Sequence, residues 1–234
     1  MANVYRIRRL VVAIALLVSL AIGALSFSTP APTGQTTPVS PPSVVHQSLP
    51  ALNKLSLLAI KGRAPKTDYT RSQFGDGWTT TGGCDTRNII LNRDLHNVTT
   101  DQACNVVSGV LSDPYTGKTV QFNRGANTSA SVQIDHVVAL SDAWQKGAQQ
   151  LTRTVRVALA NDPLELLAVD GKANQQKLDG DAATWLPPNK AFRCQYVARQ
   201  IAVKLKYNLW LTQAEHDAMS GILNSCPGQN LPIN

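Results

Sequence analysis

The four cysteines of this 234-residue chain decide which distant segments can be joined covalently. Their number is even, and no two of them stand in a Cys-x-x-Cys pair, so a disulfide framework is favoured over a zinc site. Pairing between neighbours in the sequence is the favoured arrangement. It joins Cys84 to Cys104 and Cys194 to Cys226.

A helical hairpin gives the second pair a geometric reason. Apolar residues from Cys194 to Leu205 recur at helical spacing, and Thr212 with Glu215 forms a capping box that opens another helix. Two antiparallel helices joined by a short turn place the start of the first beside the end of the second. Cys194 and Cys226 stand at those two places.

Disulfides need an oxidising compartment, and the N-terminus carries the pattern of an export signal. Three arginines between positions 6 and 9 precede an apolar run at 10–25, and Ala24 and Ser26 have the spacing of a cleavage site. The run of about sixteen residues is shorter than the roughly twenty that cross a bilayer comfortably. Residues 1–26 are therefore predicted to be a signal peptide, with a retained membrane anchor as the alternative. The protein is expected to be secreted or held in the cell envelope, with no membrane contact beyond this segment.

The remainder of the chain divides into a linker and one folded domain. Residues 27–51 are rich in Pro, Thr and Ser and are predicted to be an exposed linker, and residues 52–234 form the domain. A hydrophobic share of 43% and a charged share of 16% exclude a disordered polyampholyte or a coiled coil. The net charge of +7 is compatible with a polyanionic partner.

Turn signals and apolar runs predict an α+β domain with few strands and a helical C-terminal half. Asp113–Gly117 is a strong turn signal between two strand-like runs. In chain order the predicted elements are strands at 106–111, 119–122 and 131–136, a broken helical stretch at 141–160, a strand at 164–169, a short helix at 172–177, a loop at 180–190 and two final helices.

Two short motifs carry candidate chemistry. Asp135 and His136 stand where one strand ends, and Asn174 and Lys177 lie where a helix opens after the next strand. Carboxylate and amide oxygens suit a hard cation such as Mg²⁺ or Mn²⁺, and a histidine beside that cation can take a proton from water. Metal and base together are what phosphodiester hydrolysis needs. By spacing alone, an Asp-His pair is more often structural.

Several segments resemble the HNH endonucleases, whose core is a ββα-metal fold. Gln133–Ser141 resembles the first half of their motif and Leu166–Lys177 the second half. Gly83–Asn88, Asp113–Lys118 and Gly180–Lys190 resemble the secreted actinobacterial branch of this family. That branch is grouped with the HNH domain at the C-terminus of certain modification-dependent restriction enzymes. The resemblance runs from about residue 69 to residue 226.

The resemblance implies roles for four residues. Asp135 and Asn174 match the two metal ligands, His136 matches the general base, and Lys177 matches the basic residue that follows the second ligand. The implied cofactor is a divalent cation, Mg²⁺ before Mn²⁺, and no small-molecule cofactor is expected. We expect the metal ligand Asp135 to be exposed, so that its replacement by alanine leaves the fold intact.

Two positions depart from the family pattern. Glu165 stands where relatives usually have an Asn that fixes the histidine loop, and Leu178 stands where they often have Gly. The Glu165 carboxylate can either hold that loop through backbone N–H groups or point into the site. Asn161 lies nearby and is a candidate to replace the missing Asn.

The leading hypothesis is an exported, metal-dependent, monomeric endonuclease that cleaves DNA, with RNA as a second candidate, and shows little sequence specificity. The first alternative is a catalytically weakened HNH-fold module that binds nucleic acid or the cell envelope. The second is a structural domain held together by disulfides. Basic residues at 193–206 are expected to form a solvated helix face, with contacts to a nucleic-acid backbone as the alternative.

Overall fold

The structure is a computed structural model that describes residues 50–232. The predicted signal peptide and nearly all of the predicted linker lie outside the described residues. The first described helix begins at Ala51, which is the last residue of the predicted linker. No helix within residues 50–232 combines the length and the apolar character needed to cross a membrane.

Within residues 50–232, three small antiparallel sheets form the β part of the fold. The turn at 113–117 joins two neighbouring strands, as the sequence predicts. The sheets consist of β1 (Thr80–Thr81) with β2 (Cys84–Asp85), of β3 (Leu95–Thr100), β4 (Val106–Ser112) and β5 (Thr119–Asn123), and of β6 (Val132–His136) with β7 (Leu166–Asp170).

Helices make up the rest of the regular structure. The α-helices are α2 (Ala51–Leu55), α3 (Thr86–Asp94), α4 (Leu140–Gln145), α5 (Arg153–Ala160), α6 (Gly171–Lys177), α7 (Arg193–Lys206) and α8 (Gln213–Asn224). Short 3₁₀ helices are η2 (Arg71–Phe74), η3 (Ser129–Ser131), η4 (Ala148–Gln150) and η5 (Lys190–Phe192). The α+β class is confirmed. The predicted break within 141–160 is the segment between α4 and α5.

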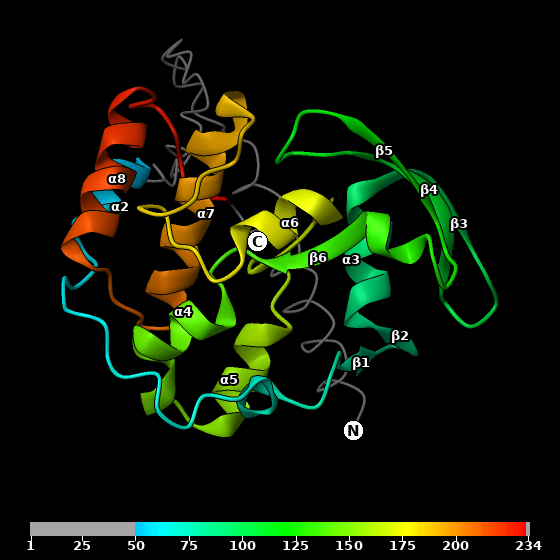
Figure 1. Cartoon of the computed structure of the whole chain (residues 1–234), viewed down its shortest axis with the longest axis horizontal. Helices are drawn as coiled ribbons and strands as arrows, with labels where there is room; N and C mark the ends of the chain where they lie inside the picture. The colour runs from blue at the N-terminus through cyan, green and yellow to red at the C-terminus, as the bar shows by residue number, and fades with distance from the viewer. Residues whose placement is uncertain (1–49, 233–234) are drawn as a thin grey trace, which may run out of the picture. The chain divides into compact units, whose positions relative to one another are not determined.

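The β6–β7 pair separates two hydrophobic cores. Val132 and Ile134 face a core shared with α3 and the β3–β4–β5 sheet, and Leu167 and Val169 face a core shared with α7 and α8. Successive strand residues point to opposite faces, so an antiparallel pair buried on both sides must be apolar at most positions. Figure 1 shows the β3–β4–β5 sheet on one side of β6 and the helices α2, α7 and α8 on the other.

Local chemistry fixes the step from β7 into α6. The Asp170 side chain accepts a hydrogen bond from the Ala173 N–H and so caps the first turn of α6. A Cβ atom at Gly171 would lie 2.1 Å from the Ala130 carbonyl oxygen, which only a glycine avoids. The start of α6 is therefore held close to the chain that enters β6.

Both predicted disulfides are present, Cys84–Cys104 and Cys194–Cys226. The second joins the start of α7 to the second residue after the end of α8, as the helical-hairpin prediction requires. Thr212 caps α8 by accepting the Glu215 N–H, which confirms half of the predicted capping box. The Glu215 carboxylate instead points into the protein and pairs with lysines.

Candidate functional site

The end of β6 and the start of α6 bring the predicted site residues to one cavity. Asp135, His136 and Asn174 all line a pocket of about 240 Å³, together with Arg71 and Asp179. The β6–β7 register places Asp135 opposite Leu167 and His136 opposite Leu166. Because α6 follows β7 directly, Asn174 returns to the residues at the end of β6.

Asp135 is buried and already has two hydrogen-bond partners. Its Oδ1 accepts from Lys177 Nζ at 2.8 Å, and its Oδ2 accepts from the Tyr115 hydroxyl. The Lys177 ammonium also donates to the His136 carbonyl at 2.7 Å. The expectation of an exposed Asp135 is therefore wrong, because only 5% of this residue reaches solvent. Its replacement by alanine would leave the Lys177 charge without its partner in the protein interior.

His136 is held in an orientation that leaves one ring nitrogen available. Its Nε2 lies 3.0 Å from the Ala160 carbonyl, which can only accept, so Nε2 carries the proton and Nδ1 keeps its lone pair. The imidazole lies parallel to the Trp78 ring, with the ring centroids 5.7 Å apart. Burial, and then the nearby Arg71 charge, lower the pKa of His136 to about 3. The ring is therefore neutral at physiological pH.

Glu165 supports the chain that follows His136. Its Oε2 accepts the Val138 N–H at 3.2 Å, and its own backbone carbonyl accepts the Val137 N–H at 2.9 Å. The residue is fully buried, and this burial raises the pKa of its carboxyl well above the ordinary value. Of the two arrangements that the sequence leaves open, the structure contains the one in which Glu165 holds the histidine loop.

Asn161 and Asn174 have separate surroundings. Asn161 uses its side-chain oxygen for the Thr79 N–H and its amide for the Val157 carbonyl, so the structure does not bring it to the histidine loop. Asn174 donates its amide to Gln133 Oε1 at 2.9 Å. This bond fixes the amide group, and its oxygen could bind a cation in the cavity that Asp135 also lines.

The donor set fits a small hard cation. Residues 50–232 contain no cluster of three or more His, Cys, Asp or Glu side chains arranged as metal ligands. Asp135 still has lone pairs that Lys177 and Tyr115 do not use, and Asn174 supplies a neutral oxygen. One carboxylate and one amide oxygen, completed by water and a substrate phosphate, match what Mg²⁺ requires.

Several residues of the site have no clear signal in the sequence. The Tyr115 hydroxyl reaches Asp135 because the Asp113 carboxylate, which caps its own turn, also accepts the Asp170 N–H at 2.9 Å. The sequence marks Tyr115 only as part of a turn. Arg71 begins the 3₁₀ helix η2 and Trp78 lies in the irregular chain after it, and nothing in their spacing indicates the site.

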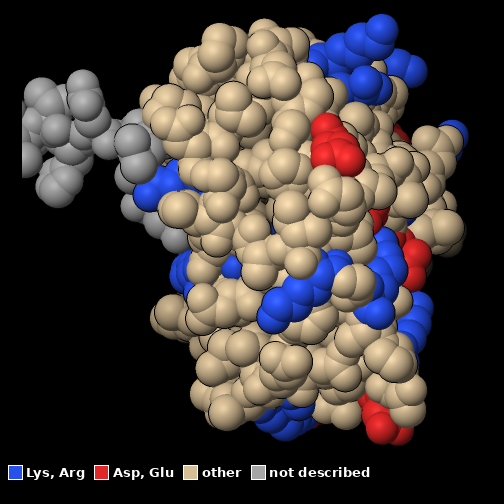
Figure 2. All heavy atoms as spheres, turned by 90° about the vertical axis from the view of Figure 1, so that its left-hand side faces the viewer, with Lys and Arg blue, Asp and Glu red and all other residues tan. Residues whose placement is uncertain are grey.

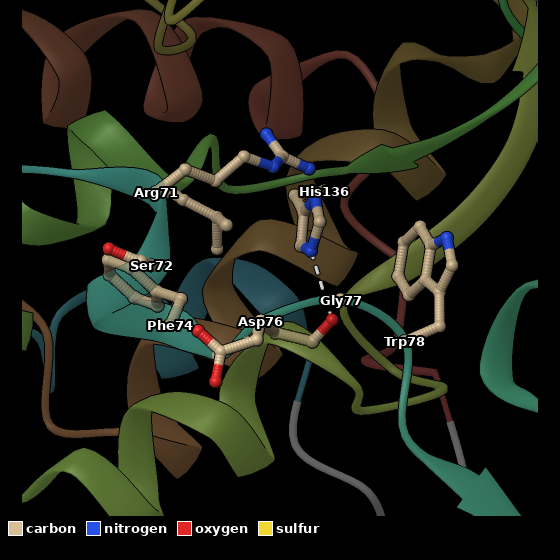
Figure 3. Close-up of a pocket in the computed structure, with 10 residues that line it drawn as sticks. Arg71, Ser72, Phe74, Asp76, Gly77, Trp78 and His136 are labelled. Carbon is tan, nitrogen blue, oxygen red and sulfur yellow. Dashed lines mark hydrogen bonds between the residues drawn. The ribbon is translucent and has the colours of Figure 1, made fainter.

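A second cavity lies against His136. It measures about 360 Å³ and is lined mainly by residues 71–78, together with His136, Leu140 and Ala160. Figure 3 shows the Arg71 side chain extending toward the imidazole and the Trp78 ring beside it. Arg71, His136 and Leu140 line both cavities, so these three residues stand at the boundary between them.

The basic residues of α7 are not one solvated face, which corrects that expectation. Lys204 is fully buried, and Arg199 donates to the carbonyls of Leu164 and Leu166. Lys206 is 45% exposed and pairs with Asp162 at 2.6 Å. The helix buries basic side chains in order to bind carbonyl and carboxylate groups that are themselves in the interior.

Comparison with known proteins assigns the family. The family model described as GmrSD restriction endonucleases, C-terminal domain, matches residues 85–222, which is more than half of the chain. A protein of Arthroderma benhamiae, described as an uncharacterized secreted protein, is 38% identical over 191 residues, 81% of this chain and 91% of that protein. The match includes β6, β7 and α6, and it begins after the 71–78 segment. The chain therefore belongs to the family of the C-terminal domain of GmrSD restriction endonucleases.

Proposed function

We propose that this protein is an exported, metal-dependent endonuclease of the HNH type that hydrolyses phosphodiester bonds in DNA with little sequence specificity. The observation that carries the proposal is the position of His136. Its imidazole is neutral, its Nε2–H is held by a backbone carbonyl, and it lines the same cavity as Asp135 and Asn174. Membership of a restriction-endonuclease family supports the same assignment.

In this mechanism Nδ1 of His136 accepts a proton from the attacking water. The Ala160 carbonyl fixes the tautomer, and it stabilises the imidazolium that forms because it accepts from the protonated ring. The Trp78 ring restricts rotation of the imidazole. Glu165 keeps the Val137 and Val138 backbone in place after the base.

Asp135 and Asn174 would hold the divalent cation, and Lys177 orients Asp135 from inside the protein. A bound Mg²⁺ would neutralise charge on the phosphate and on the leaving oxygen. Lys177 already balances the Asp135 charge, so we expect the cation to bind weakly until a substrate phosphate joins the site. Arg71 lies beside His136 and can contact the phosphate as well.

The charge of the surface supports a nucleic-acid partner without sequence reading. Figure 2 shows one side of the molecule, where Lys and Arg side chains form separate groups among mostly uncharged residues. Such charges contact phosphates and carry no sequence information themselves. Export is supported by the N-terminal pattern and by the Arthroderma benhamiae relative, which is described as a secreted protein.

One observation favours the alternative, a non-catalytic binding module. Both oxygens of Asp135 have protein donors, and one of these donors is a buried ammonium group. If this pair does not yield to a cation, the fold can still bind nucleic acid without cleaving it.

A plasmid-nicking assay of the full chain separates the two functions. We expect nicking with Mg²⁺ or Mn²⁺ and none with EDTA. His136→Ala should lower the rate by roughly 10²- to 10⁴-fold, the usual effect of losing a general base. Thr70→Ala, an exposed change outside both cavities, serves as the matched control. Salt-dependent filter binding without any nicking would support the binding module instead.

A further inference from the structure

The cavity formed by residues 71–78 has no role in the proposed proton transfer, and it shares a wall with the base. We define it as the 71–78 pocket. Its volume of about 360 Å³ lies within the range of roughly 300–1,000 Å³ that is typical of small-ligand sites. His136 separates it from the cavity of Asp135 and Asn174. A group bound there would lie directly beside the reacting phosphate.

The lining of the pocket suits a flat, uncharged ring. Phe74, Trp78 and Leu140 supply aromatic and apolar surface. Gly75 and Gly77 have φ values of +108° and +144°, and a Cβ added at Gly77 would meet no atom within 4 Å. The backbone at Gly77 is therefore open at the pocket and can approach the polar edge of a ring, whereas the Gly75 N–H already donates to the Ser72 carbonyl at 3.1 Å.

Charge orients a nucleotide across the boundary between the two cavities. Arg71 stands next to His136, where a phosphate is attracted. Asp76 also lines the 71–78 pocket, and its carboxylate pairs with Arg153 at 3.2 Å. Figure 3 shows Arg71 reaching toward the imidazole while the Asp76 carboxylate extends away from it. An anionic group thus prefers the Arg71 end, and an uncharged ring can occupy the remainder.

We propose that the 71–78 pocket binds the unpaired base of the nucleotide next to the phosphate at His136, so that the protein prefers single-stranded over duplex nucleic acid. A base within a duplex is stacked on both faces and paired at its edge, so it enters such a pocket only after unstacking. This inference rests on the proposed function because it places the phosphate at His136. The part of the lining contributed by residues 71–78 precedes the family-matched range 85–222, whereas His136, Leu140 and Ala160 lie within it.

Binding without cleavage gives the first test. The full chain is titrated in EDTA with a five-nucleotide thymidine oligomer and with the same oligomer carrying one central abasic residue, and heats of binding are measured. Stacking of one base is worth about 1–3 kcal/mol, so the abasic oligomer should bind roughly 5- to 150-fold more weakly. Equal affinity for the two oligomers would overturn the inference.

A matched pair of variants gives the second test. The hydroxyls of Thr70 and Ser72 are hydrogen-bonded to each other at 2.9 Å, and both residues are exposed, but only Ser72 lines the pocket. Thr70→Leu and Ser72→Leu therefore break the same bond, and only the second fills the pocket. We expect Ser72→Leu to remove the preference for the base-containing oligomer, and Thr70→Leu to keep it. The inference is wrong if both variants retain the preference.

Cleavage assays then separate this inference from the proposed function. With Mg²⁺, the full chain should cut a single-stranded oligonucleotide at least several-fold faster than the matched duplex, and Ser72→Leu should reduce that ratio toward one. Base-dependent binding in EDTA without any cleavage would support the pocket and contradict the nuclease proposal. Cleavage that is equal on single and double strands, with no effect of an abasic residue, would support the nuclease and overturn the pocket.

Discussion

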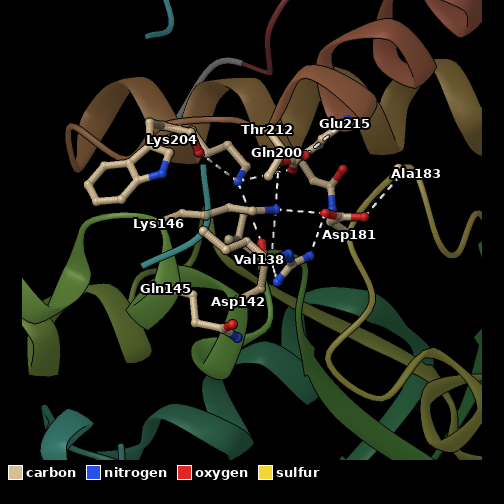
Figure 4. Close-up of polar contacts among 12 residues, drawn as sticks. Val138, Asp142, Gln145, Lys146, Asp181, Ala183, Gln200, Lys204, Thr212 and Glu215 are labelled. Carbon is tan, nitrogen blue, oxygen red and sulfur yellow. Dashed lines mark hydrogen bonds and ion pairs between the residues drawn. The ribbon is translucent and has the colours of Figure 1, made fainter. Parts of the chain in front are cut away.

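Buried lysines in two regions of residues 50–232 have their charges neutralised in different ways. Lys177 lies at the site, where it pairs with Asp135 beside an open cavity. Lys146 and Lys204 lie among the helices, in what we define as the helix-layer cluster, shown in Figure 4. Its members are Lys146, Lys204, Asp142, Asp181 and Glu215, with Arg63 at its edge.

The helix-layer cluster is balanced and closed. Lys146 Nζ lies 2.7 Å from Asp142, 2.8 Å from Asp181 and 2.6 Å from Glu215. Burial alone would lower the pKa of Lys146, but the carboxylates of Asp142 and Glu215 outweigh it and raise the pKa. Three cations meet three carboxylates, and the network joins α4, α7, α8 and the loop after α6. The positive and negative charges of the cluster are therefore paired with each other inside the protein.

The site is balanced in part only. Lys177 and Asp135 cancel, but Glu165 is fully buried, and its Oε1 has neither a hydrogen bond nor an ion pair in the described structure. Asp142 Oδ1 and Glu215 Oε1 of the helix-layer cluster also lack a hydrogen bond, but each is paired with a lysine, at 2.7 Å and 3.0 Å. Arg71 stands at the surface of the same region. The difference suggests that the fully paired helix-layer cluster holds the helices together, whereas the site keeps polar groups that can still bind a ligand.

The largest expected effect comes from breaking the closed network. Lys146→Ala leaves buried carboxylates without their central cation, and we expect it to lower the free energy of unfolding by about 3–5 kcal/mol. This is a large fraction of the roughly 5–15 kcal/mol typical of a domain. The measurement is urea denaturation followed by circular dichroism.

The control for this prediction is an exposed pair. Arg153 pairs with Asp76 with 58% and 83% of their side chains exposed, so Arg153→Ala should change the free energy of unfolding by less than about 1 kcal/mol. A Lys146→Ala protein as stable as Arg153→Ala would show that the cluster does not hold the helices together.

Breaking the Lys177–Asp135 pair at the site should also lower the free energy of unfolding, but by less. Asp135→Ala leaves the Lys177 ammonium with only the His136 carbonyl, and we expect a loss of about 3 kcal/mol, near the lower limit for a broken buried pair. Adding Lys177→Met should restore much of the stability, because it removes the unpaired charge. Thermal unfolding of the single and double variants measures the coupling. Strictly additive losses would contradict a direct ion pair.

The sequence predicts this pair better than it predicts the cavity around it. Asp135, His136, Asn174 and Lys177 lie on two elements that are adjacent in space because β6 and β7 pair and α6 follows at once. The turn and strand patterns near these residues involve only neighbouring positions, so they can be recognised from the sequence. The balance of charge in the helix-layer cluster joins residues from position 63 to position 215, and no local pattern reveals such contacts.

The same limit explains the missed residues. Arg71 and Trp78 reach the site through irregular chain and one 3₁₀ turn, for which hydrophobic periodicity offers no guide. The sequence predicts Lys204 on a solvated face because charge alone usually means exposure, and its buried partners Asp142 and Glu215 belong to other helices. The disulfides could be predicted because each joins two cysteines that follow one another among the cysteines of the chain.

A third prediction compares the site with the helix-layer cluster by making the same change, glutamate to glutamine, in each. Burial raises the pKa of Glu165 above its ordinary 4.5, so the protonated form stabilises the fold below about pH 4.5, and this stabilisation is lost as pH rises through the folded-state pKa. Glu165→Gln mimics the protonated form at every pH. We expect it to match the parent near pH 4 and to be more stable than the parent at pH 8.

Glu215→Gln is the matched control within the closed cluster. Glu215 is equally buried but contacts both Lys146 and Lys204, so the loss of its charge should destabilise the protein at pH 8. Denaturant midpoints of both variants at the two pH values give the signs. Equal signs for Glu165→Gln and Glu215→Gln would remove the proposed distinction between the groups.

The smallest expected effect concerns the residues that follow the two lysine-bearing helices. Leu178 ends α6 with φ +51° and ψ −123°, has 76% of its surface exposed, and lines the cavity of Asp135. Asn208 follows α7 with φ +52°. Leucine is strained at positive φ, and ψ −123° also takes Leu178 outside the left-handed helical region, whereas asparagine adopts positive φ more readily. Leu178→Gly should therefore raise the free energy of unfolding by about 1 kcal/mol after the greater freedom of glycine in the unfolded chain is subtracted, and Asn208→Gly should leave it unchanged or lower it. Calorimetry of the two variants decides the matter. If only Leu178→Gly raises the free energy of unfolding, the strain is specific to the end of α6 beside the cavity, as expected of a ligand-binding region. If both glycine variants raise it, the strain is a general property of these helix ends.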